Sequence, residues 1–137
     1  MQPLSPAEKA YLQEWLEVAD PDLRAAERML ADDPSIYGYH IPFACQQAVE
    51  KYCKGALLAH GNKFPRAHDL PELLNRLQPV LTFSAAELDQ ADELADYAVE
   101  TRYPPQTRVT LAEMQEALRI ARYFQARLRP LVQAALL

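Results

Sequence analysis

Apolar residues recur at intervals of three and four positions along most of the chain, and this spacing constrains the fold more than any other feature. Side chains at such intervals fall on one face of an α-helix. The first stripe extends from about residue 6 to 32 and consists of Leu12, Leu16, Ala19, Leu23, Ala26 and Leu30. Asp20-Pro21 interrupts it, and the sequence leaves open whether this proline kinks one helix or starts another.

Further helices are indicated by two more stripes and by residues that start or stop helices. The second stripe consists of Ile41, Cys45, Ala48, Tyr52, Ala56 and Ala59, and Gly61 is placed to end it. The last stripe consists of Leu111, Met114, Leu118, Ala121, Gln125, Leu128 and Val132. Helix-start signals stand at Asp69 with Pro71, at Ser84 with Glu87, and at Thr110 with Glu113. The helix from residue 84 is expected to reach about Val99.

No segment alternates between apolar and polar residues as a half-buried strand does, and no repeat or linker is visible. The 137 residues include only three glycines and suit a single domain over residues 1–137. We therefore predict an all-α fold. Its architecture is an up-and-down antiparallel four-helix bundle with an additional short helix in the crossover between residues 62 and 83.

The cysteines and the apolar runs predict the compartment. Cys45 and Cys53 lie eight positions apart in one predicted helix, about 12 Å along its axis, which is too far for a disulfide. Buried, reduced thiols are typical of the cytoplasm. The N-terminal residues lack the features of a signal peptide, and no apolar run approaches the roughly 20 residues of a membrane span. We expect a cytoplasmic protein with no membrane segment.

Charge is segregated along the chain, although the net charge of −5 argues against generic affinity for nucleic acid. Residues 84–100 carry six acids and no base. Residues 51–68 carry four bases and no acid, and residues 117–137 carry four arginines and no acid. Such blocks are able to build local fields of either sign.

The second stripe contains polar residues that a purely packed helix does not need. Glu50 and Lys54 are spaced for a helical ion pair, and Gln47 and Lys51 share a neighbouring face. A solvated helix surface is the simplest interpretation. The amides of Gln46-Gln47 beside the apolar stripe argue against it, because buried amides need hydrogen-bond partners. They indicate a polar network or a partner surface.

The stretch "HGNKFPRAHDL", residues 60–70, admits three interpretations. Asp69 is placed to cap the following helix, with His68 packed at the junction. Arg66 and His68 precede that helix N-terminus, where an anion such as phosphate is favoured. A metal site would need His40, His68-Asp69 and an acid such as Asp92 or Asp96. Glu-x-x-His and Cys-x-x-Cys pairs are missing, and we predict neither a metal nor a cofactor.

The stretch "ETRYPP", residues 100–105, closes the acidic run. Arg102 is a cation near a helix C-terminus, which the helix dipole favours, and Tyr103-Pro104 forces an extended exit. Arg102 is also placed to bind a carboxylate, a phosphate or a partner. Motifs for a nucleophile or a phosphate loop are missing, and no catalytic residue is assigned.

Four segments, in this order and at these separations, resemble the HEPN family, named for its occurrence in higher eukaryotes and prokaryotes and for nucleotide binding. They are "WLEVADPDLRAAERML", "FACQQAVEKYCKGALLAHG", "FPRAHDLPELL" and "ETRYP", and the resemblance covers about residues 8–130. It implies a helical bundle that dimerises. Many members adjoin or are fused to a minimal nucleotidyltransferase, and several such pairs act as toxin and antitoxin. The family's polar positions fall on Gln47, Glu50, Lys51, Lys54, His68, Asp69, Arg102 and Tyr103.

One departure from the family pattern bears on activity. Ribonuclease members carry an Arg, four to six further residues and then a His, whereas Thr107, Arg108 and Val109 stand at those places after Arg102. Neither threonine nor arginine titrates near neutrality, as acid–base cleavage requires. We therefore predict that the chain does not cleave RNA.

The function favoured by the sequence is a non-catalytic, homodimeric helical module. It is expected to bind a nucleotide, or a minimal nucleotidyltransferase partner in a toxin–antitoxin-like pair. The cations expected to make these contacts are Lys51, Lys54, Arg66, His68 and Arg102. One alternative is a ribonuclease toxin with a degenerate motif that pairs His68 with Arg102 on RNA. The other is a structural dimerisation module.

Overall fold

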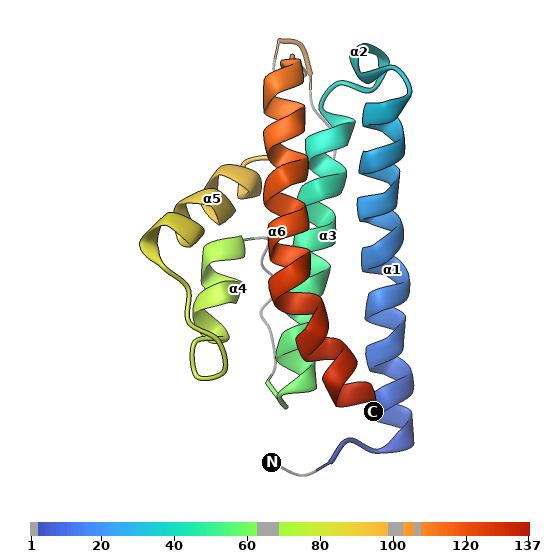
Figure 1. Cartoon of the computed structure of the whole chain (residues 1–137), viewed down its shortest axis with the longest axis vertical. Helices are drawn as coiled ribbons and strands as arrows, with labels where there is room; N and C mark the ends of the chain where they lie inside the picture. The colour runs from blue at the N-terminus through green and yellow to red at the C-terminus, as the bar shows by residue number, and fades with distance from the viewer. Residues whose placement is uncertain (1–2, 63–68, 99–102, 106–107) are drawn as a thin grey trace.

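The all-α prediction is confirmed by the computed structural model, which describes residues 3–62, 69–98, 103–105 and 108–137 (Figure 1). Within these residues all regular structure is helical. The helices are α1 (Pro6–Ala31), α2 (Pro34–Tyr37), α3 (His40–Ala59), α4 (Leu70–Arg76), α5 (Ala85–Ala95) and α6 (Leu111–Leu136). The predicted major helices and the predicted short helix, α4, are all present.

The three long helices pack against one another and form the body of the bundle. In Figure 1, α1 runs up the molecule, whereas α3 and α6 run down it. The shorter helices α4 and α5 pair with each other and lie along one side of the body, where α4 and α5 contact α3 and α5 contacts α6. The fourth side of the bundle is thus shared by two short helices.

The first helix is continuous through Pro21, which settles the question that the sequence left open. A capping box of Ser5 and Glu8 starts α1, and Pro21 stands inside it. Leu16 and Leu23, on either side of the proline, are both buried. Because the apolar stripe packs along its whole length, burial outweighs the hydrogen bond that the proline removes.

The predicted elements differ from the structure in three details. Asp33 and Pro34 start a one-turn helix, α2, that the spacing does not predict. Helix α5 ends at Ala95, and Tyr97 N–H then donates to Leu94 O at 3.1 Å in a turn. Leu111, expected in the buried stripe, is 50% exposed because it is the first residue of α6. Val99, the expected end of the fifth helix, lies outside the described residues.

A glycine allows the three long helices to approach closely. A Cβ atom at Gly55 of α3 would lie 3.3 Å from Val132 Cγ2 of α6 and 3.4 Å from Trp15 Cβ of α1. Cys45 and Cys53 of the same helix are buried free thiols. Burial raises the pKa of Cys45 to about 12, which keeps this thiol neutral and unreactive.

Candidate functional site

The amide and charged residues of α3 form a polar row within the helix. Gln47 Nε2 donates to Gln46 Oε1 at 2.7 Å, and Gln46 Nε2 donates to Glu50 Oε1 at 3.1 Å. Lys54 Nζ donates to Glu50 Oε2 at 2.9 Å. Gln46 is fully buried and Glu50 is 5% exposed. The predicted ion pair and polar network are confirmed, and the interpretation as a solvated surface is wrong for Gln46 and Glu50.

Lys51 faces another helix. Its ammonium forms an ion pair with Asp22 of α1, and both side chains are about a quarter exposed. The side chain of Lys54 is 11% exposed and pairs with Glu50. Both lysines that the sequence selects as phosphate ligands are therefore charge-compensated in the free protein, and Lys51 is the more accessible of the two.

A second polar cluster joins the three long helices. Arg129 of α6 holds Asp20 of α1 with two hydrogen bonds, at 3.0 and 2.7 Å. The hydroxyl of Tyr52 donates to Asp20 Oδ1 and accepts from Gln125 Nε2 at 3.0 Å. The Arg129 hydrogen bonds lower the pKa of Asp20, and burial raises the pKa of Tyr52. The sequence signals only a cap or kink at Asp20, because its partner is 109 positions away.

The arginines of the C-terminal basic block have carboxylate partners. The ion pairs are Arg119–Glu116, Arg122–Glu27, Arg127–Glu87 and Arg129–Asp20. The block therefore produces less positive field than its sequence indicates. By contrast, the acids Asp89 and Glu93 of α5 and its C-cap residue Asp96 are exposed, as expected for a solvated face.

The loop residues predicted to bind a ligand are described only in part. Asp69 caps α4 as predicted, since its Oδ1 accepts from Glu72 N–H at 3.4 Å. Tyr103 is 73% exposed. Arg66, His68 and Arg102 lie outside the described residues. Within the described ranges, no three His, Cys, Asp or Glu side chains gather as metal ligands would.

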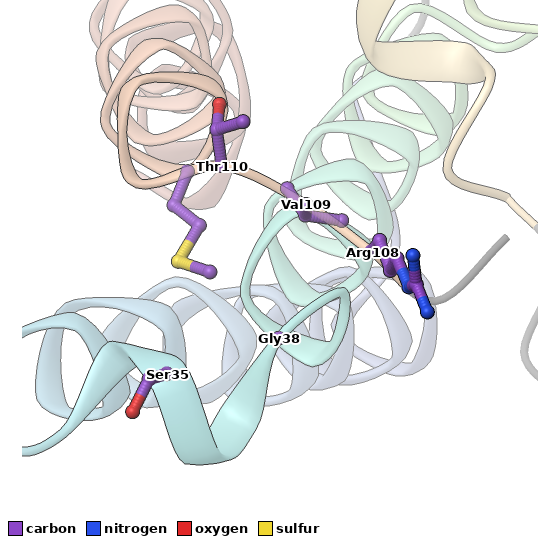
Figure 2. Close-up of a pocket in the computed structure, with 6 residues that line it drawn as sticks. Ser35, Gly38, Arg108, Val109 and Thr110 are labelled. Carbon is purple, nitrogen blue, oxygen red and sulfur yellow. The ribbon is translucent and has the colours of Figure 1, made fainter. Parts of the chain in front are cut away.

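A pocket that the sequence does not reveal lies where α6 begins. It encloses about 380 Å³ and is lined by Ser35, Gly38, Arg108, Val109, Thr110 and Met114 (Figure 2). The backbone of Gly38, with a φ of 56°, turns the chain from α2 into α3. Because α2 is itself not predicted by the spacing, no sequence signal brings Ser35 and Gly38 next to the segment before α6.

The side chains that line this pocket combine one cation with hydroxyl and apolar groups. Arg108 makes no side-chain hydrogen bond or ion pair with any residue in the described part of the chain. Thr110 Oγ1 accepts from Glu113 N–H at 3.1 Å and so caps α6, and Met114 of the same helix also lines the pocket. An arginine, two hydroxyls and apolar side chains are able to hold an anion.

The fold defines the class to which this protein belongs: small all-helical domains of the HEPN type. A family model for the HEPN domain matches residues 12–129, and the chain belongs to this family. No significant match is found among curated proteins. None of the described helices is both long and apolar enough to span a membrane.

Two solved structures share the fold. TT1696 from Thermus thermophilus is 29% identical and has a TM-score of 0.73, and the match covers 90% of this chain and 97% of that one. ST0689, described as an archaeal HEPN homologue, is 21% identical and has a TM-score of 0.68. That match covers 96% of this chain and 99% of ST0689. The predicted family is thereby confirmed.

Proposed function

We propose that this chain is a non-catalytic HEPN module that binds the phosphates of a nucleotide and presents the same cations to an acidic surface of a minimal nucleotidyltransferase. The observation that carries the proposal is the pocket before α6. There, the guanidinium of Arg108 has no carboxylate partner among the described residues and stands at a sequence position where ribonuclease members place a histidine.

Most of the proposed ligand contacts come from the sequence segments that precede α4 and α6. Arg66, Arg102 and Arg108 supply planar guanidinium groups that suit phosphate oxygens, and His68 adds a donor before α4. Among the helical residues, Lys51 is about a quarter exposed and is able to exchange Asp22 for a ligand phosphate. Gln47, Lys54 and Tyr103 complete the proposed set, while Glu50 orients Lys54 and Asp69 caps α4.

Dimerisation is proposed through the exposed apolar surface of α1. Tyr11 and Val18 are 50% and 44% exposed. Together with Trp15, which lies between them on the same face of α1, they line a shallow, mainly apolar depression. Exposed apolar residues that adjoin in this way mark interaction surfaces. A dimer formed through this surface would not cover the pocket at Arg108, because the two share no lining residue.

ATP is expected to raise the melting temperature of the wild-type protein, because a ligand specific to the native state stabilises it by mass action. The increase should be a few degrees at millimolar ATP, and the double variant Arg102→Gln/Arg108→Gln should lose it. Differential scanning fluorimetry measures both. Arg76→Gln is the matched control, since Arg76 is an exposed arginine paired with Glu72 on α4.

Two outcomes contradict nucleotide binding at this site. One is a melting temperature unchanged by millimolar ATP. The other is an equal increase in the wild type and in the Arg102→Gln/Arg108→Gln double variant, which would place the ligand elsewhere on the molecule.

A further inference from the structure

A groove between α1 and α6 concentrates arginines that the proposed nucleotide site does not use. It encloses about 360 Å³ and is lined by Arg24, Glu27, Arg28, Ala31 and Arg122. The first four residues belong to α1, and Arg122 reaches the groove from α6. Because the two helices pack against each other, the guanidinium groups come from both walls.

The groove has an excess of positive charge in a chain whose net charge is −5. Its one carboxylate, Glu27, lies 3.6 Å from Arg122. Arg24 and Arg28 are exposed and form no ion pair with any residue of the described ranges, unlike all four arginines of α6. Two guanidinium groups therefore lack a counter-charge from the described part of the protein.

The stability of α1 explains only one of these two arginines. Arg28 lies in the last turn of the helix, where the helix dipole favours a cation. The dipole effect fades within that turn, and Arg24 stands one turn earlier. Like charges four residues apart also repel each other across a helix face. An external anion bound between them removes this repulsion.

An anion in the groove meets guanidinium groups from both helices and one carboxylate, that of Glu27. One guanidinium group is able to donate two parallel hydrogen bonds to phosphate oxygens. A chain of phosphates offers enough oxygens for three arginines, whereas a single carboxylate has only two.

We propose that the groove formed by Arg24, Arg28 and Arg122 is a second anion site, which binds the phosphate groups of a polyphosphate chain. Arg24 and Arg28 hold the ligand from α1, and Arg122 holds it from α6. The site is built from other elements than the pocket at Arg108, so its occupancy does not depend on the function proposed above.

The test is isothermal titration of the full chain with tripolyphosphate, inorganic phosphate and sulfate at one fixed ionic strength. Tripolyphosphate is expected to bind more tightly than either single anion. The double variant Arg24→Gln/Arg28→Gln should weaken tripolyphosphate binding at least about tenfold, because each lost charge-assisted hydrogen bond contributes strongly. Arg119→Gln is the matched control on α6 and should change binding less than about twofold, since Arg119 pairs with Glu116 outside the groove.

A second experiment tests for a gain of affinity. Glu27→Gln removes the groove's only carboxylate and should tighten tripolyphosphate binding about threefold or more, an effect that damage to the fold does not produce.

Three results would overturn the proposal. They are equal tripolyphosphate affinity in the wild type and in Arg24→Gln/Arg28→Gln, weaker binding in Glu27→Gln, and no heat of binding at millimolar tripolyphosphate. The first two are independent of the nucleotide test, which changes Arg102 and Arg108 in the segment before α6.

Discussion

Replacing Glu50 with alanine is expected to lower the free energy of unfolding by about 3–5 kcal/mol. The carboxylate of Glu50 is buried and accepts hydrogen bonds from Gln46 at 3.1 Å and from Lys54 at 2.9 Å. Alanine removes this acceptor from a fully buried amide and from an ammonium whose side chain is 11% exposed. Removing one member of a buried pair is more destabilising than replacing both, because the other charge stays in a site of low polarity.

Urea denaturation of three variants measures this effect. Glu50→Ala is compared with the double variant Glu50→Leu/Lys54→Met, which should recover much of the lost stability because no charge remains. Glu116→Ala is the exposed control and should lose less than about 1 kcal/mol, since its partner Arg119 is half exposed. A loss below about 1 kcal/mol for Glu50→Ala would contradict a buried structural role for this pair.

Replacing Gly55 with leucine is expected to lower the free energy of unfolding by about 3 kcal/mol. Even a Cβ atom at this position lies 3.3 Å from Val132 Cγ2 and 3.4 Å from Trp15 Cβ. A longer side chain forces α1 or α6 away from α3, and the core packing of the three long helices is lost around it.

Gly55→Ala separates crowding from helix propensity. Alanine has a helix propensity about 1 kcal/mol more favourable than that of glycine, but its Cβ must displace Val132 by a few tenths of an ångström. Because the two effects oppose each other, the unfolding free energy of Gly55→Ala should stay within about 1 kcal/mol of the wild-type value. Val132→Ala in the Gly55→Leu background should restore part of the loss. Equal stability of Gly55→Leu and the wild type in thermal denaturation would show that the helices do not meet at this glycine.

Local sequence signals predict the helices well because they act over three or four residues. The capping boxes at Ser84 and Thr110 start α5 and α6 as expected, and Asp69 starts α4. The apolar stripes correctly identify the buried faces of α1 and α3. The ion pair of Glu50 with Lys54 also follows from spacing alone, since both residues belong to one helix turn.

Interactions between helices are what the sequence does not predict. Lys51 and Asp22 are 29 positions apart and Arg129 and Asp20 are 109 apart, so only the packed bundle shows that these charges are compensated. The pocket around Arg108 depends on α2, whose single turn is too short to show a periodicity. Charge blocks in the sequence therefore do not predict which cations lack a partner, whereas capping residues do predict where helices begin.

The most direct test of the central claim, binding without cleavage, is the fate of end-labelled RNA incubated with the purified chain and resolved on a denaturing gel. Arg108→His is the matched comparison, since it rebuilds the family's spacing of Arg102 and a histidine. We predict full-length RNA with the wild type, with His68→Ala and with Arg102→Ala, and any cleavage only with Arg108→His. RNA shortened by the wild type and left intact by His68→Ala or Arg102→Ala would contradict the account.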